Sequence, residues 1–307
     1  MQHTGTRRQD IIRRLRSAGC VFAEEEADLL LGAAADTDQL ESLVDRRVDG
    51  LPLEHLLGWA DFCGLRIAVD PGVFVPRRRT EYLVRRGVTL LRELDAGPGR
   101  PPLVVDAGPG RPPVVVDLCC GSGAVGAALL AAAGPMELHA ADLDPAAVAC
   151  ARRNLSAPGA AVHTGDLFEA LPEELRGRVD LLAVNAPYVP TDAIAGMPPE
   201  ARLHEPRISL DGGVDGLALH RRIAAGATDW LVPGGWLLIE TSRSQARATR
   251  SILTDNGFAA RIRTSDALDA TVVESRLRFF AAVPDGRTPG PGGASPKPRR
   301  NLRSSSA

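Results

Sequence analysis

Short apolar runs alternate with helix-like segments from residue 114 onward, and this alternation limits the fold more than any other feature of the chain. Such an order predicts an α/β fold in which an open, mostly parallel sheet is covered by helices. The predicted strands are 114–118, 137–141, 160–164, 179–184 and 235–241, followed by a closing hairpin of 258–263 and 275–283. The predicted helices between them are 123–133, 146–155, 215–230 and 244–256.

The segment before residue 60 has helical spacing instead. Ile11, Ile12 and Leu15 fall on one face of a first helix. A later helix should begin at Thr37 as its N-cap and end just before Gly50. The apolar face of this later helix is formed by Leu40, Leu43, Val44 and Val48. We therefore expect a small helical module.

Residues 61–76 change character and predict a β-hairpin. Apolar side chains alternate there, and Asp70, Pro71 and Gly72 form a turn signal between the two expected strands. A helix should follow at 80–94. The expected organisation is a helical domain at 1–60, a hairpin linker at 61–80, the main domain at 81–283 and a disordered basic tail at 284–307.

An eleven-residue segment occurs twice in succession, as "DAGPGRPPLVV" at 95–105 and "DAGPGRPPVVV" at 106–116. Two copies are too few for a repeat fold, so we interpret them as a duplication that lengthens a surface loop. Doubling a loop costs only about 0.6 kcal/mol in closure entropy. The second copy should supply the strand, because it runs directly into "DLCCGSG".

The net charge of −2 over 307 residues gives no basic field, so stable nucleic-acid binding is not expected. Five cysteines without a Cys-x-x-Cys pair indicate reduced thiols in a cytoplasmic protein, and we expect no metal site. The N-terminus lacks an apolar signal core, and the longest apolar stretch, 124–133, is too short for a bilayer. We expect a monomer without a membrane anchor.

The first strand of the main domain ends in a loop suited to ligand binding, within "VVVDLCCGSGAVGAAL". Asp117 closes the strand, and Gly121 and Gly123 open the next helix. Glycine allows a ligand to approach the backbone closely, and a helix N-terminus offers free N–H groups. Cys119 stands where a first glycine is expected.

Two further acids follow the next strands of the sheet. Asp142 lies about twenty residues beyond the glycines, where a carboxylate can accept both ribose hydroxyls, with Asp144 as the weaker candidate. Asp166 follows the third strand and can accept from an adenine amine. Each acid alone is more often a turn or cap residue, but three at successive strand ends favour a nucleoside site.

The fourth strand ends in Asn185, Ala186, Pro187 and Tyr188. Here the chain resembles class I S-adenosylmethionine-dependent methyltransferases, and more closely the HemK/PrmC family that methylates glutamine in peptide-chain release factors. The resemblance covers about residues 50–245. It is carried by "LPLEHLLGWADFCGLRIAVDPGVFVPRRRTEYLV", "DLCCGSGAVGAAL", "NAPYVP", "EPRISLDGGVDGLALHRRI" and "LVPGGWLLIE".

The resemblance implies a Rossmann-like sheet of seven strands with the last antiparallel, and a helical domain at 1–60 that recognises the substrate. It also implies S-adenosyl-L-methionine as cofactor and a release factor with a Gly-Gly-Gln motif as partner. The cofactor residues that it implies are Asp117, Cys119, Gly121, Gly123, Asp142, Leu143, Asp166, Leu167 and Asn185. The catalytic residues would be Asn185, Ala186, Pro187 and Tyr188, and the substrate residues Asn185, Tyr188, Glu205 and Pro206.

In the family, the Asn side-chain oxygen and the next backbone carbonyl accept the two N–H groups of the substrate amide. Asn185 and the carbonyl of Ala186 would do this here, with Tyr188 packed on the amide plane. Ala186 replaces the family's first proline, and the lost preorganisation should cost about 0.4–1 kcal/mol. Arg78 and Arg79 in "PRRRTE" replace Pro and Glu of the family and change the charge near the substrate entrance.

Two other functions fit the same motif. Asn-x-Pro-Tyr also resembles enzymes that methylate amino groups of RNA or DNA bases, although the neutral charge counts against nucleic acid. The substitutions at Cys119 and Ala186 also allow a protein that binds the cofactor without turnover.

Overall fold

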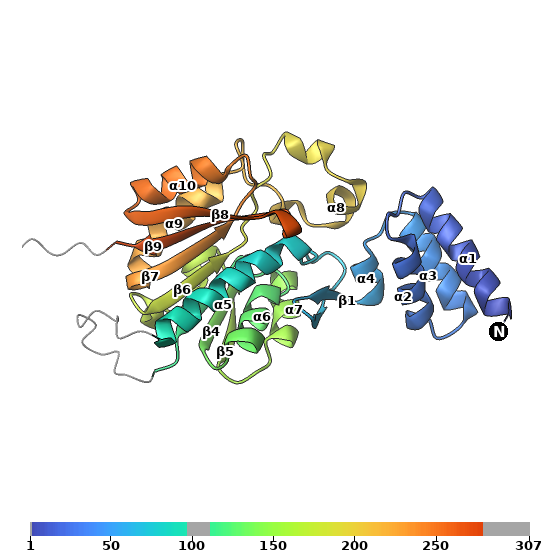
Figure 1. Cartoon of the computed structure of the whole chain (residues 1–307), viewed down its shortest axis with the longest axis horizontal. Coiled ribbons are helices and arrows are strands. Elements are labelled where there is room, and N and C mark those ends of the chain that lie inside the picture. The colour runs from blue at the N-terminus through green and yellow to red at the C-terminus, as the bar shows by residue number, and fades with distance from the viewer. Residues whose placement is uncertain (1, 97–110, 279–307) are drawn as a thin grey trace, which may run out of the picture.

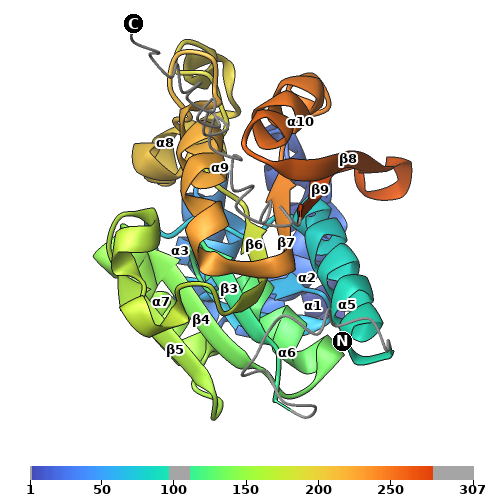
Figure 2. The same ribbon diagram turned by 90° about the vertical axis from the view of Figure 1, so that its left-hand side faces the viewer.

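The computed structural model describes residues 2–96 and 111–278, with side chains described for residues 6–94 and 111–278. Seven strands form the main sheet in the order β5-β4-β3-β6-β7-β9-β8. The strands are β3 Val114–Leu118, β4 Glu137–Asp142, β5 Ala160–Thr164, β6 Val179–Val184, β7 Leu231–Glu240, β8 Phe258–Ser265 and β9 Ala270–Leu277. β9 alone runs antiparallel to both neighbours. The predicted α/β class and the antiparallel last strand are confirmed, and Figure 2 shows how the sheet twists from β5 to β8.

Helices cover both faces of this sheet (Figure 1). One core cluster joins the sheet to α5 Glu81–Ala96, α6 Ala124–Ala133 and α7 Pro145–Asn154. A second cluster joins the opposite face to α9 Ala218–Trp230 and α10 Ala246–Asp255. Every residue of β3 and β6 is buried, as expected for parallel strands that are covered twice and therefore need apolar side chains on both faces.

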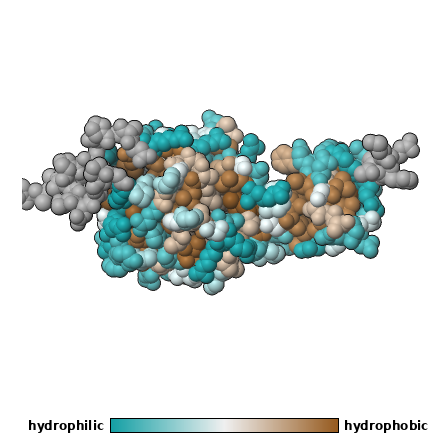
Figure 3. Space-filling view, turned by 90° about the horizontal axis from the view of Figure 1, so that it is seen from below, coloured by the Kyte–Doolittle hydropathy of each residue, from teal (hydrophilic) through white to brown (hydrophobic). Residues whose placement is uncertain are grey.

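The N-terminal helices form a lobe with a core of its own, joined to the larger lobe through a narrower neck (Figure 3). They are α1 Gln2–Ser17, α2 Ala23–Ala33, α3 Thr37–Val48 and α4 Leu53–Leu57. The predicted core residues Ile11, Ile12, Leu15, Leu40, Leu43 and Val44 are buried. Two details of the prediction were wrong. Asp36, not Thr37, caps α3 by accepting from the Gln39 N–H, and Val48 is 37% exposed.

The predicted hairpin exists, but its turn was placed too late. β1 Trp59–Phe62 pairs with β2 Leu65–Ala68 around Cys63 and Gly64, which both have positive φ. Two successive residues with positive φ fit the tight hairpin turn that follows the twist of the strands. The segment 70–73 is also a turn, with the Val73 N–H donating to the Asp70 carbonyl at 3.0 Å, but no strand follows it.

Two strands of the main sheet begin earlier than predicted, and the ends of β4, β7 and β8 differ from the prediction by one or two residues. β7 begins at Leu231 because its pairing with β6 shifts register between Val179 and Leu181, which accommodates the Pro-Gly-Gly irregularity. β9 begins at Ala270 instead of 275, because its polar residues are buried with partners. Glu274 pairs with Arg86 at 2.6 Å, and the Ser275 hydroxyl donates to the Leu237 carbonyl at 2.9 Å.

The second copy of the duplicated segment supplies β3, as predicted. Arg111 of that copy lies 2.8 Å from Asp180 at the start of β6 and anchors the entry to the strand. The remainder of the repeat at 97–110 and the expected tail at 284–307 lie outside the described residues. The predicted domain boundaries stay predictions.

Shorter elements complete the connections between strands and helices. They are α8 Pro199–His204 and the 3₁₀ turns Arg78–Thr80, Leu167–Ala170, Glu173–Leu175, Ala193–Gly196, Arg207–Ser209 and Asp266–Leu268. All five cysteines are free thiols. Across 2–96 and 111–278, no helix has the length and apolar character that crossing a bilayer requires.

Candidate functional site

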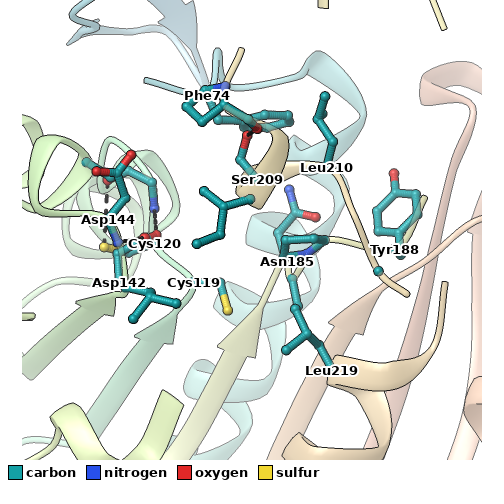
Figure 4. A pocket seen from close by; sticks show the side chains of 18 of the residues that line it. Phe74, Cys119, Cys120, Asp142, Asp144, Asn185, Tyr188, Ser209, Leu210 and Leu219 are labelled. Carbon is teal, nitrogen blue, oxygen red and sulfur yellow. Dashed lines mark hydrogen bonds between the residues drawn. The ribbon is translucent and has the colours of Figure 1, made fainter. Parts of the chain in front are cut away.

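The carboxyl ends of the parallel strands open into a cavity of about 750 Å³, within the usual range for small-molecule sites. Figure 4 shows Asp142 and Asp144 on one side of it and Asn185 and Tyr188 on the other, with Phe74 and Ser209 above. Twelve predicted site residues line this cavity: Asp117, Cys119, Gly121, Asp142, Leu143, Asp166, Leu167, Asn185, Ala186, Pro187, Tyr188 and Pro206. Gly123 and Glu205 are not part of the lining.

The two glycines of the loop after β3, Gly121 and Gly123, have different structural roles. Gly121 has φ +54° and donates its N–H to Asp142 Oδ2 at 2.8 Å, so it joins the loop to the next strand. Gly123 has φ +75° and caps α6. A Cβ on Gly123 would lie 3.0 Å from Leu155 Cδ1, so this glycine permits close packing of α6 on α7 without facing the cavity.

Asp117 is a buried carboxylate in the lining of the cavity, with only 2% of its surface exposed. Its Oδ2 accepts the Gly126 N–H at 2.8 Å. Burial raises the pKa of Asp117 to about 7, against the opposing effect of that hydrogen bond. A cationic group beside Asp117 would stabilise its ionised form and so offset the cost of burying the charge.

Asp142 at the end of β4 is held by the backbone on both oxygens. Oδ2 accepts from Gly121, and Oδ1 accepts the Asp144 N–H at 2.9 Å. Burial raises the pKa of Asp142 and outweighs these hydrogen bonds. Asp144 instead caps α7 by accepting the Ala146 N–H at 2.9 Å. This division of roles favours Asp142 over Asp144 as the ligand-facing acid.

Asp166 lines the cavity and already has a hydrogen-bond partner. Its Oδ2 accepts from Arg222 on α9 at 2.9 Å. Leu167 follows it with φ +50° and is buried against the same core cluster as β3 and β6. The Asp166–Arg222 ion pair fixes this side of the cavity and leaves Oδ1 of Asp166 as an acceptor.

Cys119 adopts φ +60°, a conformation that glycine adopts at little cost and other residues rarely adopt. This is the structural counterpart of the missing first glycine. Burial also raises the pKa of the Cys119 thiol, so it is neutral at pH 7.

Cys119→Gly should therefore raise the free energy of unfolding by about 0.5–1 kcal/mol, the relieved strain less the added chain entropy of glycine. Chemical denaturation measures this. Cys120→Gly is the matched control, because Cys120 is buried and is absent from the residues with positive φ. The control should be less stable than the wild type, and equal losses in both variants would contradict the argument.

The Asn-Ala-Pro-Tyr corner (residues 185–188) directly follows β6. Asn185 donates from Nδ2 to Thr80 Oγ1 at 3.3 Å, and Tyr188 donates its hydroxyl to Glu240 Oε1 at 3.4 Å. Burial raises the pKa of Tyr188 to about 12, so the phenol stays protonated. Ala186 is 1% exposed and packs in the core cluster.

A glycine-rich loop, residues 212–216, packs against the backbone of this corner. A Cβ on Gly212 would lie 2.8 Å from the Pro187 carbonyl oxygen, and one on Gly216 would lie 2.3 Å from the Tyr188 carbonyl oxygen. Gln245 donates to that Tyr188 carbonyl at 2.9 Å. These glycines are therefore required for close backbone packing.

Glu205, expected to bind substrate, has a different environment. Both of its carboxylate oxygens lie 2.6 Å from Arg77 Nη2, and Oε1 also accepts the Val75 N–H at 3.2 Å. It holds the segment before α5 against the loop after α8. Pro206, next to it, does line the cavity.

Several lining residues were not predicted: Phe74, Thr80, Leu219, Arg222 and Glu240. For Glu240 a signal existed, because it is an acid that closes the apolar run "WLLIE", just as Asp142 closes its own strand. Within the described ranges, no three His, Cys, Asp or Glu side chains are grouped so as to hold a metal ion.

The strand order defines a class I methyltransferase fold, and the glycine loop after β3 and the acid after β4 line its cavity at the carboxyl ends of the strands. A family model described as the methyltransferase small domain matches residues 104–197. A release factor glutamine methyltransferase of Geobacter sulfurreducens is 36% identical over 268 residues, covering 80% of this chain and 86% of that protein. The chain belongs to the release factor glutamine methyltransferase family.

Two further relatives show the breadth of this similarity. The release factor glutamine methyltransferase of Cereibacter sphaeroides is 35% identical over 292 residues, covering 87% of this chain and 95% of that protein. A 4-amino-L-phenylalanine/4-methylamino-L-phenylalanine methyltransferase of Streptomyces pristinaespiralis is 33% identical over 245 residues, covering 80% of this chain and 79% of that protein.

Proposed function

We propose that this chain transfers a methyl group from S-adenosyl-L-methionine to the side-chain amide nitrogen of a glutamine in a peptide-chain release factor. The relatives' names supply the substrate class. The observation that carries the proposal is the orientation of Asn185. Its amide nitrogen is engaged by Thr80, so its side-chain oxygen is left as an acceptor at the cavity.

The residues of the β3–β4 side fit the proposed cofactor. Asp142 is held rigidly by two backbone amides, so its remaining lone pairs suit a ribose diol. Leu143 and Leu167 offer apolar surface to a purine, and Asp166 offers an acceptor for its amine. Asp117, whose ionised form needs a cation nearby, suits an ammonium group.

When bound, the cofactor supplies a methyl group on a sulfonium that is already reactive, so the protein's task is mainly positioning. An amide nitrogen is a weak nucleophile, because its lone pair is delocalised. Asn185 Oδ1 and the Ala186 carbonyl would accept its two hydrogens, fix its plane and stabilise the positive charge that develops on it. Tyr188 and Pro187 would pack beside that plane.

Ala186→Pro should increase kcat several-fold, because fixing φ recovers about 0.4–1 kcal/mol of preorganisation. Steady-state methylation rates measure this. Ala186→Gly is the opposite control, since it loosens the same backbone and should lower kcat. Equal changes in the two variants would show that backbone freedom at this position does not limit the reaction.

Incubation with labelled cofactor and purified release factors, followed by mass spectrometry, tests the proposed function. We expect a 14 Da increase on the peptide that contains the Gly-Gly-Gln motif. If release factors gain no mass while a nucleic acid becomes labelled, the substrate class is wrong. Tight cofactor binding without turnover on any substrate would instead identify an inactive binding protein.

A second substrate class is favoured by the Streptomyces pristinaespiralis relative, whose name assigns it an aromatic amine. An aniline, like a carboxamide, presents a planar NH₂ group with two hydrogens and a delocalised lone pair. The exposed Arg79 at the cavity could pair with the carboxylate of a free amino acid. The same assay with 4-amino-L-phenylalanine distinguishes the two substrates.

A further inference from the structure

A buried carboxylate stands behind the Asn-Ala-Pro-Tyr corner without an assigned role. Glu240 ends β7, is 2% exposed and lines the cavity. Its Oε1 accepts from the Tyr188 hydroxyl and lies 3.7 Å from Arg79 Nε. Its Oε2 is buried and accepts no hydrogen bond of ordinary geometry within the described residues. A buried acceptor left in this way calls for an explanation.

Thr80 lies between Glu240 and Asn185. Its oxygen accepts from Asn185 Nδ2, so its own hydroxyl hydrogen must point elsewhere. The Thr80 hydroxyl interacts with Glu240, which lowers the pKa of that carboxyl against the larger, raising effect of burial. The free Oε2 is therefore an acceptor toward which this hydrogen can turn. Thr80 is 3% exposed, so water does not compete.

The direction of this chain of donors and acceptors matters more than its strength. An ionised carboxylate only accepts, so it commits the Thr80 hydroxyl to donate toward it. The Thr80 oxygen is then limited to accepting, and it selects the NH₂ end of Asn185. A flipped Asn185 would present its NH₂ to the substrate amide, where two donors would face each other.

We propose that Glu240 and Thr80 are positioning residues that set the orientation of the Asn185 side chain, with Asn185 Oδ1 facing the incoming NH₂ group. This inference rests on the proposed function and deepens it. Glu240 also fixes Tyr188 through Oε1, so one carboxylate holds both polar side chains of the corner.

The proposal makes the corner sensitive to pH. Protonated Glu240 gains a donor, so the Thr80 hydrogen is no longer committed to it and Asn185 can flip. The charged and titratable groups that face Glu240 are Arg79 from the turn before α5 and Tyr188 from the corner. Burial raises the pKa of Tyr188, so its phenol stays neutral over the working range, and the acid limb of activity should follow Glu240. Since burial raises the pKa of Glu240, this limb should lie above the usual range for a glutamate.

The test compares Thr80→Val, Thr80→Ser and Glu240→Gln with the wild type. Thr80→Val keeps the side-chain shape and removes the hydroxyl, and we expect kcat to fall about tenfold with cofactor affinity changed less than about threefold. Thr80→Ser restores the hydroxyl and should restore most of kcat. Glu240→Gln should lower kcat and remove the acid limb of the pH profile.

Matched controls separate orientation from loss of a buried polar group. Thr249→Val removes a fully buried hydroxyl that bonds to His220 and lies outside the cavity lining. Glu274→Gln removes a buried acid on the neighbouring strand β9. Both should leave kcat and the pH profile unchanged even where they lower thermal stability. Controls that reduce kcat as strongly as Thr80→Val, or a failure of Thr80→Ser to restore kcat, would overturn the proposal.

A second measurement needs no substrate and therefore stands if the proposed function fails. In ¹⁵N-labelled protein, the Asn185 NH₂ signal is assigned by its absence from Asn185→Ala. It should shift as Glu240 titrates in the wild type and in Thr80→Ser, and should stay constant with pH in Glu240→Gln. If the chemical shift of the Asn185 NH₂ signal does not change with pH in the wild type, the proposal is refuted. If release factors gain no methyl group, only the proposed function is refuted.

Discussion

Replacing Asn185 by alanine should lower kcat on the order of 100-fold, with tenfold as the smallest expected loss. This is the effect of losing one preorganised group that stabilises charge in a transition state. The alanine side chain leaves the Ala186 carbonyl as the sole acceptor for two amide hydrogens. The effect should appear mainly in kcat, because Asn185 contacts the nitrogen most strongly when that atom becomes positive.

Asn256→Ala is the control for this variant. Asn256 bonds the Ile252 carbonyl at 2.8 Å at the end of α10 and does not line the cavity. It should retain full kcat with a small loss of stability. If Asn185→Ala keeps more than about half of the wild-type kcat, the corner does not orient the acceptor nitrogen.

Replacing Asp142 by alanine should weaken cofactor binding by about 100-fold, because hydrogen bonds to a charged group contribute roughly 1.5–3 kcal/mol each. The variant loses the expected ribose acceptor and also releases the Gly121 and Asp144 N–H groups that the carboxylate holds. Calorimetric titration with S-adenosylhomocysteine measures the affinity without turnover.

Asp144→Ala provides the comparison two residues away. The Asp144 carboxylate caps α7, so its removal should lower the free energy of unfolding by about 1 kcal/mol. The affinity for the cofactor should change less than about threefold. Equal losses of affinity in both variants would indicate that loop integrity, and not the Asp142 carboxylate, determines binding.

The sequence predicted the parts of this molecule that depend on neighbouring residues. β3 and β6 have their predicted bounds, because strands covered on both faces need mostly apolar segments. β5 also has its predicted bounds, although it is a half-buried strand at the edge of the sheet. Asp142 could be proposed as a ligand-binding residue from the local order of the chain, because it is an acid that ends a strand and follows a glycine loop.

Features that depend on distant partners escaped prediction. β9 begins five residues earlier than predicted, and it contains Glu274, which looks like a loop residue until Arg86 is placed beside it. The hairpin turn at Cys63 and Gly64 lacks the usual Asn-Gly signal. Thr80 and Asn185 are separated by 105 positions, so no local pattern reveals the hydrogen bond between them.

The Arg77–Glu205 ion pair has a consequence for engineering this protein. The two residues are 128 positions apart, and the Glu205 side chain is 1% exposed, so the segment before α5 and the loop after α8 depend on each other. Removing one partner of such a pair typically costs about 3–5 kcal/mol. A chimera that exchanges the helical lobe should therefore join the parental chains ahead of residue 73, so that a single parent provides both members of this pair.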